Sequence, residues 1–79
     1  MLNHNLPSGI TIDGVYDASE NGEANDFIIL CYRVHDTHPW VVARYDGTST
    51  EWDYGSYFYS EAQAMKYFLA KMLAVRHLS

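Results

Sequence analysis

The stretch Ser60–Leu78 constrains the fold more than any other part of this chain, because it carries a sustained helical periodicity. Its large apolar residues recur at steps of three and four and would share one helix face: Met65, Phe68, Leu69, Met72, Val75 and Leu78. Ser60 precedes the pattern and Gln63 follows three residues later, as in an N-cap with a capping box. We therefore predict a helix over Ser60–Leu78. Its wet face would carry Gln63, Lys66, Ala70, Ala74 and His77.

A helix of this length is marginal alone in water, so its apolar face needs a sheet to cover. Four segments before it have the alternation and the β-branched or aromatic content of strands: Ile10–Tyr16, Asp26–His35, Trp40–Tyr45 and Glu51–Tyr59. Gly14 weakens the first strand or marks a bulge. The connections are short, with turn signals at Asn21-Gly22 and Asp46-Gly47, which favours an antiparallel meander.

The fold class that follows is α+β. We predict a single domain over residues 1–79, with an irregular lead-in at 1–8 and a three- to four-stranded antiparallel sheet. The order is β-β-β-β-α, and the C-terminal helix packs on one face.

One helix can cover one face of such a sheet, so the other face is predicted to hold aromatic side chains near solvent. Alternation along the last strand divides its residues into two sets. Trp52, Tyr54, Ser56 and Phe58 form one set, and the other contains Glu51, Asp53, Gly55, Tyr57 and Tyr59. An exposed apolar patch in a small protein usually marks a contact surface.

The charges are strongly segregated. The 79 residues hold ten acids and five bases, a net charge of −5. All ten acids lie between Asp13 and Glu61, where Arg33 and Arg44 alone oppose them, and three bases and no acid follow Glu61. Direct binding to nucleic acid requires a basic surface, so this distribution argues against it and favours a basic protein partner.

Carboxylates spaced over a surface can imitate a phosphate backbone and occupy a groove lined by Arg and Lys. The chain also contains seven Tyr, a residue favoured at interfaces. Acidic loops that merely keep the protein soluble are the alternative. The residues predicted to contact a partner are Asp17, Glu20, Glu23, Asp46, Glu51, Asp53, Tyr57 and Tyr59.

The sequence offers little for a metal site or for catalysis. His35 and His38 have a zinc-like spacing, but structural zinc usually draws on two ligand pairs and no second pair is present. Cys31, the single cysteine, lies in an apolar run and is predicted to be a buried, reduced core residue, which fits the cytoplasm. No serine has a nucleophile setting and no glycine-rich phosphate loop occurs. We predict no cofactor and no enzymatic activity.

The sequence also gives no sign of membrane insertion or secretion. No apolar run approaches the ~20 residues that span a bilayer. The first residues, MLNHNLPSG, lack the basic start and apolar core of a secretory signal.

A resemblance extends from Trp40 over about half of the chain. The run WVVARYD at 40–46, the segment YGSYF at 54–58, the pair Glu61-Ala62 and Phe68 resemble a pattern found in short phage and mobile-element proteins. Small size, acidity and abundant aromatic residues are similarly typical of the anti-CRISPR proteins that such elements encode. The resemblance implies an inhibitor that binds a CRISPR effector and blocks nucleic-acid loading or cleavage.

Two functional hypotheses follow from the sequence. The first is a non-enzymatic, phage-encoded inhibitor of the anti-CRISPR type, acting in the host cytoplasm, whose acidic, Tyr-rich surface docks on a basic nucleic-acid-binding partner such as a CRISPR effector subunit. The second is a small homodimeric interaction module whose uncovered sheet faces pair with each other.

Overall fold

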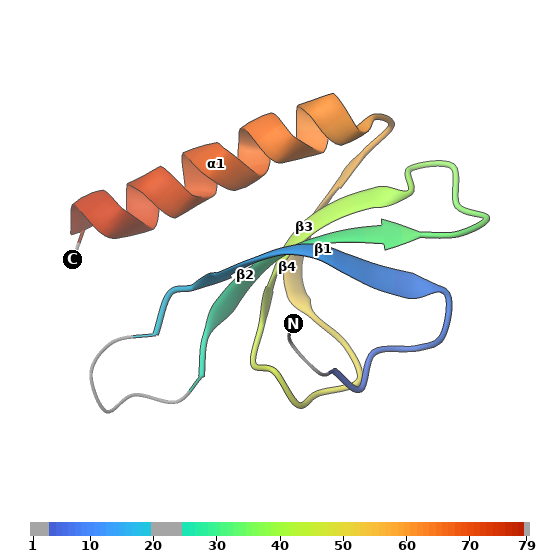
Figure 1. The fold of residues 1–79 in the computed structure, drawn as a ribbon, viewed down its shortest axis with the longest axis horizontal. Helices are drawn as coiled ribbons and strands as arrows, with labels where there is room; N and C mark the ends of the chain where they lie inside the picture. The colour runs from blue at the N-terminus through green and yellow to red at the C-terminus, as the bar shows by residue number, and fades with distance from the viewer. Residues whose placement is uncertain (1–3, 20–24, 79) are drawn as a thin grey trace.

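The structure, a computed structural model, describes residues 4–19 and 25–78 and has the predicted α+β architecture. Four antiparallel strands form one open sheet in the order β1-β2-β3-β4, and one helix packs across it (Figure 1). Their bounds are β1 Ile10–Asp17, β2 Phe27–Arg33, β3 Trp40–Tyr45, β4 Asp53–Phe58 and α1 Glu61–Leu78. The predicted order and the antiparallel meander are therefore confirmed, with strand ends shifted by one or two residues.

The helix begins where the capping pattern predicts. The backbone amide of Gln63 donates to Ser60 Oγ at 3.3 Å, so Ser60 satisfies one of the amides that the first turn leaves unpaired. Glu61 adds an acidic side chain in the first turn, where the helix dipole favours it.

The face that α1 turns to the sheet agrees only in part with the predicted one, because Phe68 and Val75 pack there but Met65 and Leu69 do not. Ala64 is fully buried and Phe68 is 7% exposed, in one cluster with Ile28, Leu30 and Val42. Met65 and Leu69, predicted to pack on the sheet, are 39% and 44% exposed. The small side chain of Ala64 lets the helix backbone approach the sheet closely, and this rotates Met65 and Leu69 outward.

Gly14 lies on the helix side of β1, where a small side chain would meet Leu30 and Phe68 at ordinary van der Waals distances. A Cβ atom at Gly14 would lie 3.4 Å from Leu30 Cβ and 3.5 Å from Phe68 Cζ. The β1–β2 register shifts between Ile12 and Gly14, which leaves Asp13 as the extra residue of a bulge. The bulge expected near Gly14 is therefore present.

The second face of the sheet is a core of its own, so the predicted uncovered face is wrong. Buried residues of this cluster are Leu6, Ile29, Cys31, Val41, Ala43 and Tyr45, with Trp52 packed against them. Leu6 belongs to the predicted lead-in and Trp52 to the β3–β4 loop, and both segments fold over the sheet. Asn5 Nδ2 donates to the carbonyl of Thr48 at 2.8 Å and ties the two segments together.

Strand β4 contains a second bulge, which corrects the predicted alternation. Val42 pairs with Ser56 and Arg44 pairs with Asp53, so Tyr54 and Gly55 together oppose a single residue of β3. The extra residue reverses the faces on either side of it. Asp53 therefore lies on the helix side of the sheet and Tyr57, opposite Val41, lies on the other side.

Candidate functional site

Acidic residues from different elements meet at one end of the sheet. In an antiparallel meander, the last residues of β1 and β3 lie at the same end of the sheet as the first residues of β2 and β4. Residues at these positions therefore become neighbours. We call this group the acidic end: Asp17, Asp26, Asp46, Glu51 and Asp53. Of the six acids predicted to contact a partner, four belong to it, and Glu20 and Glu23 lie outside the described residues.

The β3–β4 loop holds one of these carboxylates in a fixed position. Asp46 accepts hydrogen bonds from the amides of Thr48 and Ser49, both at 2.8 Å, and from Ser49 Oγ at 2.5 Å. Tyr45 Oη donates to the carbonyl of Ser49 at 2.6 Å and anchors the loop to the core. The bonds from Ser49, and then those from Thr48, lower the pKa of Asp46 to about 2. The carboxylate therefore stays ionised and fixed at neutral pH.

A similar turn fixes the carboxylate of Asp17 at the end of β1. The Asp17 Oδ1 atom accepts from Ser19 Oγ at 2.5 Å and from the Ser19 amide at 3.0 Å. These two bonds lower the pKa of Asp17. Two carboxylates on neighbouring loops thus have their positions set by their own backbone rather than by a basic side chain.

Arg44 compensates one of the five acids. Its Nε donates to Asp26 Oδ1 at 3.0 Å, and Nη2 donates to Asp26 Oδ2, a bidentate pair. The hydrogen bonds from Arg44 to Asp26 raise the pKa of the guanidinium. With Asp26 neutralised, the acidic end keeps a strong negative charge from its remaining four carboxylates.

Tyr54 is the residue of this region that the sequence analysis missed. It sits in the β4 bulge with φ of 55°, a left-handed conformation that costs a bulky residue roughly 1–2 kcal/mol, and its side chain is 87% exposed. It borders an open cleft of about 340 Å³, which is lined by Asn25, Asp26, Arg44, Tyr45, Asp46, Asp53 and Tyr54. Gly55 was the available signal, since a glycine within a strand often marks a bulge.

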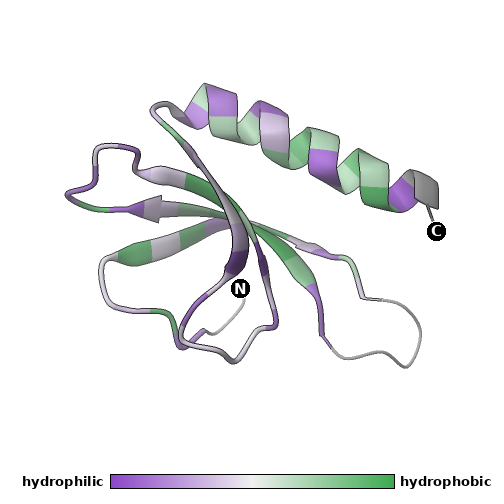
Figure 2. Cartoon of the chain, turned by 180° about the vertical axis from the view of Figure 1, so that it is seen from behind, coloured by the Kyte–Doolittle hydropathy of each residue, from purple (hydrophilic) through white to green (hydrophobic). Residues whose placement is uncertain are grey.

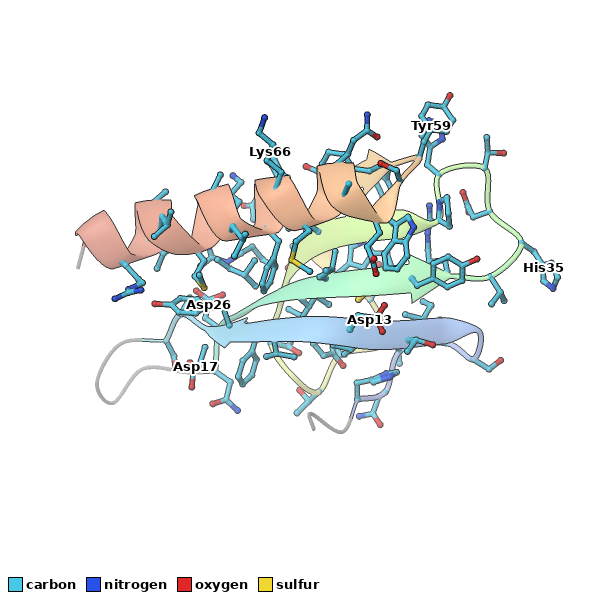
Figure 3. All side chains as sticks on the ribbon, turned by 45° about the horizontal axis from the view of Figure 1, so that its top comes forward. Asp13, Asp17, Asp26, His35, Tyr59 and Lys66 are labelled. Atoms are coloured by element: carbon cyan, nitrogen blue, oxygen red, sulfur yellow. The ribbon has the colours of Figure 1, made fainter. Side chains whose placement is uncertain are left out.

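The two predicted tyrosines lie at the opposite end of the sheet. Figure 3 shows Asp17 and Asp26 at one end and Tyr59 and His35 at the other. A strand rises ~3.3 Å per residue, so the six residue steps from Asp53 to Tyr59 span at most about 20 Å. The structure therefore separates the predicted acidic and tyrosine halves of the contact surface.

Both tyrosines are partly held by neighbouring side chains. Tyr57 is 46% exposed, its Oη accepts from Trp52 Nε1 at 3.2 Å, and Arg33 Cζ lies 4.7 Å from its ring centroid. The Tyr59 ring lies 3.9 Å from the ring of His38. These contacts fix the two rings in place, and those made by Trp52 and Arg33 reduce the part of the Tyr57 ring that a partner could contact.

Cys31 and the histidines do not assemble a reactive site. Cys31 is fully buried in the second core, and burial, with a smaller effect from Asp13, raises its pKa to about 12. Within residues 4–19 and 25–78, no group of three or more His, Cys, Asp or Glu side chains is placed to hold a metal ion. The described chain contains no helix both long and apolar enough to span a bilayer.

Comparisons of the chain with protein-family models, with curated proteins and with solved structures give no match. The geometry and charge of the surface are therefore the observations that bear on function.

Proposed function

We propose that this protein is a non-enzymatic binding protein that docks its acidic end on a basic surface of a protein partner. The proposal is supported by the position of five acidic residues, which come from two strands and two loops and lie at one end of the sheet. Asp17 and Asp46 are immobilised by their turns, so little side-chain entropy is lost when a partner binds them.

The charge of this end should act mainly on encounter. A surface with several uncompensated carboxylates attracts a basic groove over a distance of about a Debye length and raises the association rate. Tyr54 supplies what the carboxylates lack, a rigid, exposed amphipathic ring that can be desolvated in the complex. Its ring would hold the complex after the charges have formed it.

A basic groove that carries nucleic acid is the class of surface that fits these features. The resemblance to small anti-CRISPR proteins suggests a CRISPR effector subunit as the partner and the host cytoplasm as the place of action. The second functional hypothesis, a homodimer through uncovered sheet faces, loses its premise because both faces carry a buried core.

The test compares two charge reversals that change the net charge equally. Glu51→Lys alters the acidic end, whereas Asp13→Lys alters the bulge of β1, away from that end. Association with a panel of purified CRISPR effectors is measured at low and high salt. We expect Glu51→Lys to slow association more than Asp13→Lys, and the difference to shrink at high salt. If the protein binds no effector in the panel, a CRISPR effector is the wrong partner. If the two variants slow association equally, the acidic end is not the docking surface.

A further inference from the structure

The helix carries a second apolar stripe beside the face that packs on the sheet. Met65, Leu69 and Leu73 recur at steps of four and are 39%, 44% and 48% exposed. On the same helix Ala64 and Phe68 are buried. Figure 2 shows hydrophobic residues alternating with hydrophilic ones along much of α1. We call Met65, Leu69 and Leu73 the outer stripe.

A soluble helix with one covered face normally presents polar residues on the other. Three neighbouring large side chains, each more than a third exposed, form a contiguous apolar surface of the kind that marks a contact site. The stripe lies on α1, whereas the acidic end lies on the strand ends and the β3–β4 loop, so the two surfaces are separate.

The nearby edge of β1 is a poor candidate for the same contact. A bulge at Asp13 interrupts the pairing pattern of this strand, and Asp13 and Asp17 are exposed charges along it. Bulges and charges are the features that prevent an edge strand from pairing with another chain. The contact is therefore expected through side chains of the helix.

The charges along α1 identify the partner that fits. Glu61 stands in the first turn, the bases Lys66, Lys71 and Arg76 follow, and no acid lies after Glu61. If two copies of the helix lie antiparallel and cross at Leu69, Met65 of each copy opposes Leu73 of the other. The same arrangement brings Glu61 next to Arg76 of the other copy, twice by symmetry. A parallel pair would instead place Lys66 and Arg76 beside their own copies.

We propose that two copies of this chain form a two-fold symmetric dimer through the outer stripe, with antiparallel α1 helices. The contact is isologous, since the same patch on each copy meets itself. The antiparallel helix dipoles add a further attraction. The outer stripe has three residues, whereas a standard interface takes roughly 20–30 residues from each partner. The dimer should therefore dissociate on dilution.

The experiment is sedimentation velocity of the full chain over a series of concentrations. The expected mass rises from the 9.1 kDa of one chain toward twice that value as concentration increases. Leu69→Lys places two like charges at the two-fold axis and should give a monomer throughout. Val15→Lys, at an exposed apolar position on β1, is the matched control and should leave the mass unchanged.

A charge exchange tests the orientation of the helices. Glu61→Lys alone should weaken the dimer, and Glu61→Lys combined with Arg76→Glu should restore it. Both changes oppose the helix dipole, so helix stability alone predicts that the double variant is worse than the single one. Circular dichroism verifies that each variant is folded. A wild-type chain that stays monomeric, a Leu69→Lys variant that still dimerises, or a double variant without recovery would overturn the proposal.

Discussion

Arg44 pairs in register with Asp53 on β4 but donates from Nε and Nη2 of its guanidinium to Asp26, just before β2. One basic side chain thus neutralises the acid on one neighbouring strand and leaves the acid on the other for a partner. The negative charge of the acidic end therefore includes that of Asp53 and not that of Asp26, because Arg44 pairs with Asp26.

The first prediction concerns this ion pair. Arg44 and Asp26 are 38% and 40% exposed, so the pair should contribute below about 1 kcal/mol to stability. Arg44→Gln should therefore change the melting temperature by a few degrees at most. It should speed association with a basic partner at low salt, because it adds an uncompensated carboxylate. A severe loss of stability would show that the pair has a structural role.

The second prediction separates stability from binding at Tyr54. Glycine adopts positive φ without steric cost, so Tyr54→Gly should preserve or raise the melting temperature. The same variant should dissociate faster from the partner, because the exposed ring is lost. Tyr57→Ala, at the other end of the sheet, is the control and should leave the dissociation rate near that of the wild type. If Tyr57→Ala speeds dissociation and Tyr54→Gly does not, the partner contacts the tyrosines predicted from the sequence instead of Tyr54.

The third prediction tests the orientation of the helix with two adjacent residues. Phe68→Ala should cost about 3–5 kcal/mol, since the ring is buried between α1 and the sheet. Leu69→Ala should cost about 1 kcal/mol or less, because nearly half of the side chain is exposed. Urea unfolding of both variants at low protein concentration gives the comparison. Similar losses would contradict the observed helix orientation.

The fourth prediction follows from the pKa of Asp46. It is about 2 in the folded chain, below the value of about 3.9 expected of an unfolded chain. A carboxyl shifted in this direction stabilises the fold above pH ~4, and that contribution is lost as pH falls from about 4 to 2. Asp46→Asn should be less stable than the wild type at pH 6, and the two should converge near pH 2. A constant difference at every pH would mean that ionisation of Asp46 is irrelevant.

The fifth prediction concerns Cys31. Because burial raises its pKa to about 12, its thiol should react slowly with a disulfide reagent in the folded chain and rapidly in urea. Cys31→Ser should cost about 1–3 kcal/mol through a hydroxyl placed among apolar side chains. Stoichiometric zinc in protein purified without chelator, lost in this variant, would contradict a purely structural role.

The sequence predicted the succession of four strands and a helix, and favoured an antiparallel meander, because its signals are local. Alternating apolar residues, short turns and the Ser60 cap each act within a few residues. The helix orientation was predicted only in part, because Met65 and Leu69 belong to an apolar sector adjoining that of Ala64 and Phe68. Periodicity cannot say which of two adjoining sectors meets the sheet, since that depends on how closely Ala64 lets the backbones approach.

The candidate site was predicted only in part, for a related reason. Three of its five acids, Asp17, Asp26 and Asp46, flank the predicted turns, so their grouping follows from the meander. The face of each β4 residue depends on strict alternation, and one extra residue at Tyr54 reverses it. The burial of Leu6 depends on contact with residues far along the chain, which no local pattern records.

The two cores give this chain two separate optical reporters. Trp40 packs against the cluster under α1, whereas Trp52 packs against the cluster on the other face of the sheet. A variant that keeps one indole would emit fluorescence that senses one side of the sheet alone. Release of the helix from the sheet would then change the emission of Trp40 while Trp52 still reported a closed core, so the order in which the two layers open during unfolding becomes measurable.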